Sequence, residues 1–168
     1  FYKDINDNPP YSAYDMKGKT YRYFEGEPLY EFGYGLSYAT FVYDKMQIPE
    51  NMVAGEDLNV KIEVENTSDI RGEEVIQVYI QNPSADEYNP LKTLAAVGRE
   101  RFAPGEKKTL TFKINKEQFS SVDPRGEKVI VPGTYEISIG GAQPSKGRVK
   151  NKSVVLKKIN VSGATIKI

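Results

Sequence analysis

Residues 59–83 read NVKIEVENTSDIRGEEVIQVYIQNP and contain two alternating apolar segments with a turn between them. In NVKIEVE (59–65) every second residue is apolar, which is the pattern of a β-strand with one face on a core and one in water. NTSDIRG (66–72) supplies turn-forming residues, and Pro83 ends the second segment because proline lacks the amide hydrogen that a sheet needs. The stretch therefore predicts two consecutive strands.

The second segment carries apolar side chains on both of its faces. Ile76, Val78 and Ile80 share one face, and Val75 and Tyr79 lie on the other. Since a strand that is apolar on both faces is normally covered on both, this pattern predicts burial or contact on each side of the strand.

Short segments with the same alternation continue to the end of the chain, separated by turns rich in proline and glycine. The only helix that we expect among them is a single turn at 116–119. Seven or so strands at this spacing predict an all-β protein with an antiparallel β-sandwich. The further strands are expected at 94–102, 109–114, 129–131, 135–139, 154–161 and 165–168.

The composition excludes several classes of function. The 168 residues suffice for one domain with an extension, and no apolar run reaches the ~20 residues of a membrane helix. Lys plus Arg and Asp plus Glu both number 23, so no net charge favours nucleic acid or an anionic membrane. Cysteine and histidine are absent, which excludes disulfides, thiol nucleophiles and the usual general base. The chain opens FYKDIN, without a signal-peptide pattern, and we expect it to be a fragment of a longer protein.

Aromatic residues gather at the start of the chain, where thirteen of the nineteen Phe and Tyr residues lie in the first 43 positions. The segment YRYFEGEPLYEFGYGLSYATF (21–41) alone holds eight of them, interrupted by glycines and a proline. Two interpretations are open. The rings form a tyrosine platform that stacks on sugars, or they fill a joint between two domains.

The area of the rings favours the joint. Each aromatic side chain buries ~150–250 Å², so five exposed rings would create a patch of roughly 1,000 Å², whereas the largest patch on a typical monomer is about 300–600 Å². Gly33 and Gly35 let the backbone approach a neighbour closely, and Arg22 can reach a carboxylate across the joint. The residues expected at this domain interface are Tyr21, Arg22, Tyr23, Phe24, Phe32, Tyr34, Leu36, Tyr38 and Phe41.

Two blocks carry a family resemblance. The first is the segment 21–41, in which PLY-x-FGYGLSY is quite specific. The second runs from RGEEVIQVYIQNP (71–83) through LKTLAAVGRERFAPGEKKTLTFKI (91–114) to VIVPGTYEISIGG (129–141). Together they resemble the C-terminal region of glycoside hydrolase family 3, the β-glucosidases and β-xylosidases, which ends in a fibronectin type III-like domain.

The resemblance implies an antiparallel immunoglobulin/fibronectin type III-like β-sandwich over 36–168, of which 143–168 is a tail with a final strand. It implies an irregular, aromatic-rich connector from an upstream α/β domain over 1–35. In the family both catalytic residues lie upstream of the matched part, so no catalytic residue is carried over. The implied role is a non-catalytic accessory domain that stabilises and positions the upstream catalytic domains, its partners in the same polypeptide.

By the same resemblance the parent enzyme acts on a β-linked oligosaccharide, is bacterial, and is periplasmic or secreted. The alternative function is an autonomous carbohydrate-binding module that uses surface tyrosines. A third possibility is an adhesion or protein-interaction module, which no sequence feature supports specifically. Without the upstream partner, residues 1–35 have three outcomes open to them: they fold back on the sandwich, pair with another copy of the chain, or are disordered.

No other chemistry is expected. DINDN (4–8) places oxygen ligands at alternate positions as a calcium loop does, but Pro9 stands where that loop needs glycine, so we expect a polar linker. Glycoside hydrolysis needs two carboxylates about 5–5.5 Å or about 6.5–9.5 Å apart, and the carboxylates here fall in turns or on solvated strand faces. We expect no catalytic pair, metal, cofactor, nucleic acid or membrane partner.

Overall fold

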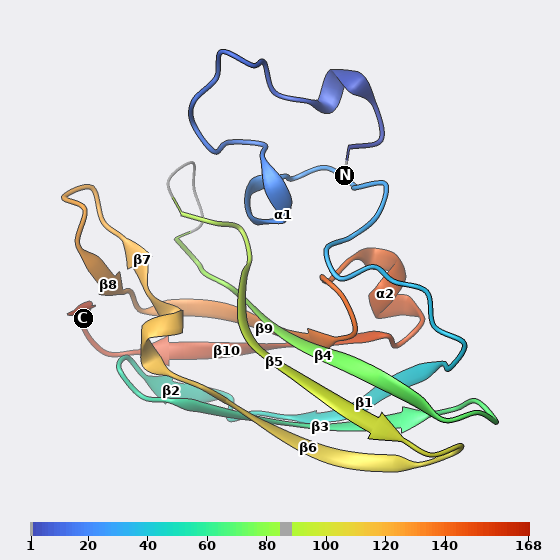
Figure 1. The fold of residues 1–168 in the computed structure, drawn as a ribbon. Coiled ribbons are helices and arrows are strands. Elements are labelled where there is room, and N and C mark those ends of the chain that lie inside the picture. The colour runs from blue at the N-terminus through green and yellow to red at the C-terminus, as the bar shows by residue number, and fades with distance from the viewer. Residues whose placement is uncertain (1, 85–88) are drawn as a thin grey trace.

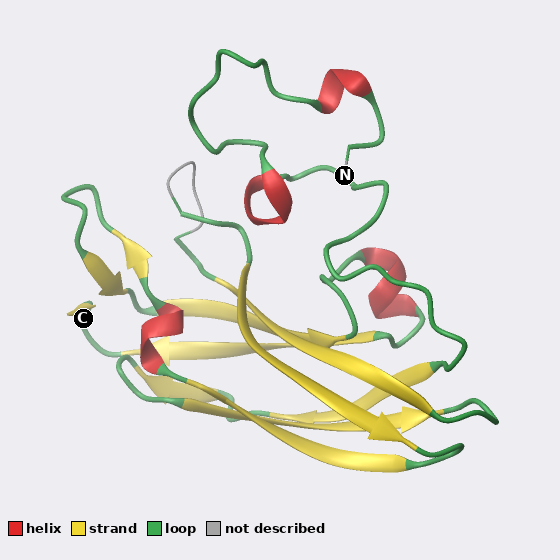
Figure 2. Ribbon diagram, viewed as in Figure 1, coloured by secondary structure: helices red, strands yellow, loops and turns green. Residues whose placement is uncertain are grey.

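The computed structural model describes residues 2–84 and 89–168, and its longer strands form two packed β-sheets (Figures 1 and 2). One sheet has the order β1-β3-β6 and is antiparallel. The other has the order β2-β10-β9-β4-β5, in which β2 and β10 run parallel, and a small sheet β11-β8-β7 extends one end. The strands are β1 Phe41–Gln47, β2 Asn51–Val53, β3 Leu58–Asn66, β4 Gly72–Gln81, β5 Thr93–Phe102, β6 Lys107–Ile114, β7 Ser121–Val122, β8 Lys128–Ile130, β9 Gly133–Gly140, β10 Val154–Ser162 and β11 Ile166–Lys167.

The core lies between the two sheets and follows from the alternation in the sequence. On β3 the side chains of Val60, Ile62 and Val64 are fully buried, while the residues between them are not. Ile137 and Ile139 on β9 are equally buried in the facing sheet. Because burying each such side chain contributes about 1.5–3 kcal/mol, this alternation fixes which face of each strand turns inward. The predicted all-β sandwich is confirmed, and so is the single helical turn, η2 (Lys116–Phe119).

The sequence pattern did not predict β1, and a bulge explains why. Phe41, Tyr43 and Met46 are all buried, although a regular strand would bury alternate residues only. The register shifts between Asp44 and Gln47, where Lys45 adopts a positive φ of 51°. A β-bulge of this kind adds one residue to the strand and breaks the period of two. The short elements β2, β7, α1 (Thr20–Tyr23) and α2 (Lys146–Lys150) were not predicted either.

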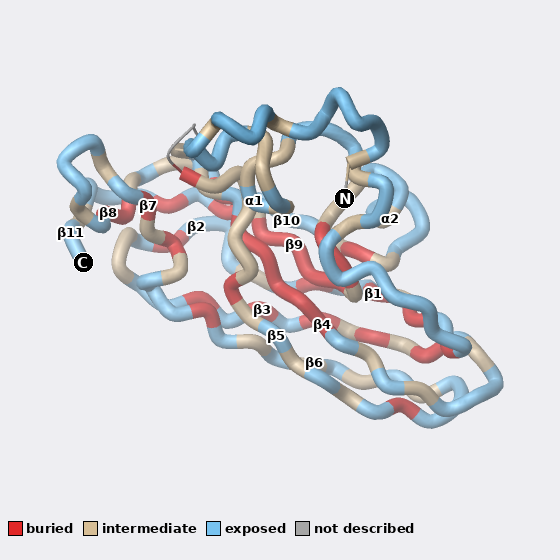
Figure 3. The backbone as a smooth tube through the Cα atoms, turned by 45° about the horizontal axis from the view of Figure 1, so that its top comes forward, coloured by how far each residue is buried: buried red, intermediate tan, exposed pale blue. Residues whose placement is uncertain are grey.

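The outer face of the five-stranded sheet is covered over part of its area (Figure 3). On β4 the outward residues Gln77 and Tyr79 are 6% and 1% exposed, whereas Val75 is 38% exposed. The predicted contact on both faces of this strand is therefore confirmed at Tyr79 and wrong at Val75. The reason is that residues 21–34 of the N-terminal segment (2–40) lie over the Gln77–Tyr79 part of the sheet and leave Val75 outside it.

The N-terminal segment lies on the side of the five-stranded sheet that faces away from β1, β3 and β6 (Figure 1). Of the three outcomes open to residues 1–35, the described part from Tyr2 onward shows folding back for residues 21–34. The calcium-loop candidate forms the short helix η1 (Ile5–Asp7), and the carboxylate of Asp4 caps it by accepting from the Asn6 amide. Within 2–84 and 89–168 no helix is long and apolar enough to span a bilayer.

Candidate functional site: the aromatic segment and its groove

Residues 21–34, which we call the aromatic segment, are anchored to the sheet by three rings. Tyr21 stacks on Phe32 with ring centroids 4.5 Å apart, and it meets Tyr79 of β4 edge-on at 6.1 Å. Each such pair contributes about 0.5–1.5 kcal/mol beyond the area it buries. Burial also raises the pKa of the Tyr79 hydroxyl, because the phenolate would be poorly solvated there. Tyr79 is thus the point at which the aromatic segment meets the sandwich.

Gln143 holds both ends of the aromatic segment at once. Its backbone amide donates to the carbonyl of Phe32 at 2.9 Å, and its side-chain oxygen accepts from the Phe32 amide at 3.3 Å. Its side-chain nitrogen donates to the carbonyl of Tyr21 at 3.4 Å. A further backbone bond, from the Leu91 amide to the carbonyl of Arg22 at 2.7 Å, ties the segment to the chain that enters β5. Since Gln143 is only 4% exposed, its amide needs these partners.

Gly33 of the aromatic segment lies against the side chain of Gln77 on the sheet. Its φ is +85°, and a Cβ added to it would lie 2.3 Å from the Nε2 atom of Gln77. The Gln77 side chain is held in place because Nε2 donates to the carbonyl of Gly141 at 3.2 Å and Oε1 accepts from the Tyr79 hydroxyl. The position therefore needs glycine both for its backbone angle and for space.

A charged network fixes the end of the aromatic segment near α2. The carboxylate of Glu31 accepts from the Ser145 hydroxyl at 2.8 Å and lies 3.6 Å from the Arg148 guanidinium. The same guanidinium lies 5.7 Å from the centroid of Tyr34, whose other neighbour is the Tyr30 ring at 4.6 Å. Partly buried ion pairs with several partners contribute more than exposed ones, so this network favours one position of the segment.

Beyond Tyr34 the chain leaves the sheet, and its apolar side chains are exposed to water. The side chain of Leu36 is 92% exposed, and that of Tyr38, two positions later, is 96% exposed. Tyr34 and Phe32 are themselves 46% and 45% exposed. Exposed apolar side chains therefore recur along the chain from Phe32 to Tyr38, and the buried Ala39 separates them from β1.

The other predicted interface residues lie in different surroundings. Tyr23 and Phe24 are half-buried within the N-terminal segment, where Phe24 meets the Tyr2 ring edge-on at 5.0 Å. Arg22 is exposed, and its guanidinium lies 5.9 Å from the Tyr23 ring centroid.

Phe41 needs a correction, because it is not at the surface. It is a core residue of β1, 9% exposed, and packs edge-on against Phe102 with centroids 5.4 Å apart. The alternation of β1 turns its side chain inward, so it is unavailable to a partner domain.

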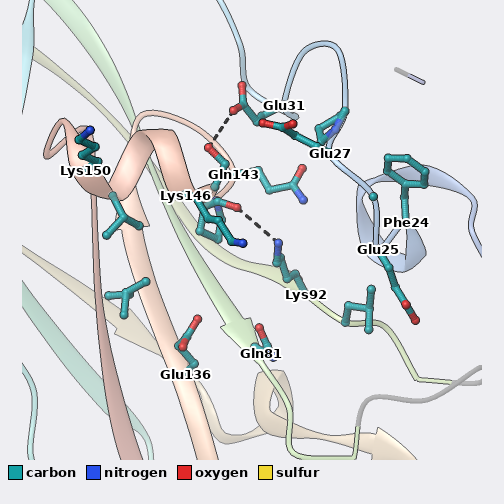
Figure 4. Close-up of a pocket in the computed structure, with 17 residues that line it drawn as sticks. Phe24, Glu25, Glu27, Glu31, Gln81, Lys92, Glu136, Gln143, Lys146 and Lys150 are labelled. Atoms are coloured by element: carbon teal, nitrogen blue, oxygen red, sulfur yellow. Dashed lines mark hydrogen bonds between the residues drawn. The ribbon is translucent and has the colours of Figure 1, made fainter. Parts of the chain in front are cut away.

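A groove of about 940 Å³ lies between the aromatic segment, α2 and the five-stranded sheet, where Gln81 of β4, Glu136 of β9 and Leu156 of β10 line it (Figure 4). Near its centre the ammonium of Lys92 donates to the carbonyl of Pro144 at 3.4 Å. Burial lowers the pKa of Lys92, and the charge of Glu136 partly offsets that effect. At the rim, Glu27 pairs with Lys3 at 2.6 Å, and this hydrogen bond lowers the pKa of the Glu27 carboxyl.

Sequence reasoning missed Gln77, Gln143 and Lys92. The glutamines lie in or directly after predicted strands, but no local pattern shows that a segment over 40 residues away will cover them. One signal did exist for Gln77: it falls between Val75 and Tyr79, on the face of β4 for which a second contact was predicted.

Residues 74–143 match the family model described as "Fibronectin type III-like domain". The chain carries a fibronectin type III-like domain. The match runs from β4 to the residue that clamps the aromatic segment, and the sheets on either side of the core agree with it.

The domain has relatives among curated glycosidases. The chain is 40% identical over 147 residues to a xylan 1,4-beta-xylosidase of Xylanibacter ruminicola, a match that covers 87% of this chain and 17% of the relative. It is 33% identical over 159 residues to a periplasmic beta-glucosidase of Salmonella typhimurium, covering 93% of this chain and 20% of the relative. The chain therefore spans about a fifth of the length of these relatives.

Parts of solved structures have a similar fold. A beta-glucosidase from Listeria innocua in complex with isofagomine matches with a TM-score of 0.71 and 36% identity, over 83% of this chain and 18% of that one. A beta-glucosidase from Erythrobacter marinus matches with a TM-score of 0.73 and 26% identity, over 96% of this chain and 21% of that one. The predicted resemblance to the fibronectin type III-like region of family 3 glycosidases is confirmed.

Proposed function

We propose that this fibronectin type III-like domain is a non-catalytic accessory domain at the C-terminus of a family 3 β-glucosidase or β-xylosidase. Its role is to stabilise and position the upstream catalytic domains of the same polypeptide. The proposal is supported by the share of the glycosidase relatives that the chain spans, about a fifth.

The environment of the carboxylates supports a non-catalytic role. A general acid in a glycosidase needs a raised pKa and access to the glycosidic oxygen. Burial raises the pKa of Glu74, but its carboxylate accepts from the hydroxyl of Tyr43, a core residue of β1, at 2.6 Å. In the groove, Glu27 and Glu31 are each engaged by a cation. These carboxylates have structural partners in place of a substrate.

The observation that carries the proposed role is the exposure of Leu36 and Tyr38, at 92% and 96%. Covering two such side chains contributes about 1.5–3 kcal/mol each. They directly follow the anchored aromatic segment, so a partner that covers them also contacts the half-exposed rings of Tyr34 and Phe32. Because the relatives are about five times as long as this chain, an upstream domain of the same polypeptide is the partner that we infer.

The test compares the full-length parent enzyme with the isolated 168-residue chain. Replacing Leu36 and Tyr38 by serine together lowers the melting temperature of the parent but leaves that of the isolated chain unchanged. Removing everything from Tyr21 onward lowers the melting temperature or soluble yield of the parent further. Val53→Ser, at a 52% exposed position on the edge strand β2, is the matched control. A truncated parent with full activity and an unchanged melting temperature contradicts the proposal.

The alternative, sugar binding by surface tyrosines, is favoured by the side chains of Tyr11, Tyr14 and Tyr38, which are fully or almost fully exposed. Against it, Tyr30 and Tyr34 meet at 44° and pack on each other, with Arg148 over the Tyr34 ring. A platform for sugar rings needs open, flat aromatic faces that lie in one plane, and the rings of Tyr30 and Tyr34 do not form such a plane. We therefore retain the accessory role.

A further inference from the structure

The groove beneath the aromatic segment has the size and composition of a small-molecule site. Its volume of about 940 Å³ falls within the range of about 300–1,000 Å³ for ligand pockets. Its walls come from parts of the chain far apart in sequence: the aromatic segment, the end of β4, the middle of β9, the strand β10 and the helix α2 (Figure 4). Because Gln143 and Gly33 fix the position of the aromatic segment, the groove is built before any ligand arrives.

Hydrogen-bonding groups with unused capacity converge on this groove. The Lys92 ammonium has three donors, and its side-chain hydrogen bond within the described residues is the long one to Pro144, at 3.4 Å. The side chains of Glu136, Gln81 and Lys146 are drawn toward the same space (Figure 4), and within residues 2–84 and 89–168 none of the three makes a side-chain hydrogen bond or an ion pair. The groove thus offers both donors and acceptors.

Apolar side chains complete the lining. Leu91, Val149 and Leu156 lie along the groove together with the ring of Phe24. A ligand that matches this lining has hydroxyl groups around its edge and C–H groups on its faces, and that is the surface of a pyranose ring.

The balance of charge favours a neutral ligand. Lys92 and Lys146 would attract an anion, but Glu136 and Glu25 line the same groove and would repel it. A cation would be attracted by these glutamates and repelled by these lysines. A neutral polyhydroxylated ligand accepts hydrogen bonds from the ammonium groups and donates to the carboxylates, so that it uses both sets of charges.

We propose that the groove beside Lys92 and Glu136 binds a short, neutral, β-linked oligosaccharide. The choice of β-linked glucose or xylose units rests on the proposed function, whereas the existence of the groove is independent of that function. The lowered pKa of Lys92 agrees with the site, because a desolvated ammonium gains most from a ligand acceptor. The binding surface differs from the surface tyrosines, which lie outside this lining.

The test is a titration of the isotope-labelled 168-residue chain with cellotetraose and with xylotetraose, followed by NMR amide shifts and by calorimetry. At least one of the two sugars gives saturable shifts centred on Lys92, Glu136 and Lys146. Lys92→Met and Glu136→Gln each weaken binding roughly tenfold or more, as expected for the loss of a hydrogen bond to a charged group. Lys61→Met, on the exposed face of β3 in the other sheet, leaves the affinity unchanged, and so does Tyr38→Ala.

Three outcomes overturn this inference: no saturable shift with either sugar, saturable binding of inorganic phosphate at these residues in place of sugar, or binding that survives Lys92→Met and is lost in Tyr34→Ala. Melting curves of every variant establish that each one is folded. The accessory role is tested separately by the stability of the full-length parent, so a failed titration leaves that role untouched, and a failed stability test leaves the groove untouched.

Discussion

Gly33 lies directly over the side chain of Gln77, so close that a Cβ on Gly33 would be 2.3 Å from the Gln77 Nε2 atom. The glycine belongs to the aromatic segment and the glutamine to β4, 44 positions later in the chain. This contact sets how closely the segment can approach the sheet. Its strength can be measured by adding a single methyl group.

We expect Gly33→Ala to weaken docking of the aromatic segment by about 1–3 kcal/mol, because alanine is strained at a φ of +85° and its Cβ meets Gln77. Hydrogen exchange of the amides in 21–34 measures the effect. Gly35→Ala is the matched control, since its Cβ would have nothing within 4 Å. Equal protection in the two variants would show that the Gly33 contact is not needed.

Gln143→Ala removes two of the three hydrogen bonds that Gln143 makes to the aromatic segment and leaves the Phe32 amide and the Tyr21 carbonyl without that partner. We expect a loss of about 1–3 kcal/mol in docking free energy, seen as faster proteolysis between 21 and 34. The strands keep their protection, because the core side chains are untouched. Gln47→Ala, at an exposed end of β1, is the control and leaves the proteolysis rate unchanged.

Phe41 and Tyr38 are three residues apart and differ in what they contact. Phe41 packs on Phe102 in the core, so Phe41→Ala should lower the free energy of unfolding of the isolated chain by about 3–5 kcal/mol. Tyr38 is 96% exposed, so Tyr38→Ala should change it by less than about 0.5 kcal/mol. Denaturant unfolding measures both. A large effect at Tyr38 in the isolated chain would mean that its ring already has a partner.

Glu74 gives stability a dependence on pH. Burial raises the folded-state pKa of Glu74 above the ordinary value of 4.5. Its contribution to the free energy of unfolding is therefore fully present below pH 4.5 and is lost as the pH rises through the folded-state pKa. Glu74→Gln stays neutral throughout. We therefore expect the stability of Glu74→Gln relative to wild type to increase from about pH 4 to about pH 8. Thermal unfolding at several pH values measures this difference.

The neighbouring Glu73 is a control, because its pKa is shifted in the opposite direction and its effect on stability therefore changes with pH in the opposite sense. Its hydrogen bond to Arg101 lowers its pKa, so its contribution is present above the ordinary carboxyl range and is lost as the pH falls. Glu73→Gln should therefore lose stability relative to wild type as the pH rises. Parallel curves for the two variants would contradict the assignment of Glu74 as the buried carboxyl.

Much of the sandwich could be predicted from local pattern, because the buried positions of a regular strand are apolar and alternate with exposed positions in the sequence. The alternation of Val60, Ile62 and Val64 predicted β3, and the same reasoning predicted β4 and β9. It missed β1, since the bulge at Lys45 breaks the period that the prediction depends on. It also placed Phe41 at an interface, because an aromatic residue at the end of an aromatic segment looks the same whether its strand turns it inward or outward.

By itself, the sequence determined that this protein is an all-β sandwich and that an aromatic-rich segment precedes it, because period-two burial and residue composition are local properties of the chain. Only the tertiary structure decided which aromatic rings are anchored and which are exposed, and that a groove forms between that segment, α2 and the five-stranded sheet. Those features depend on contacts such as Tyr21 with Tyr79 and Tyr21 with Gln143, between residues up to 122 positions apart. The free energy of such contacts depends on the folded geometry, and no local pattern encodes it.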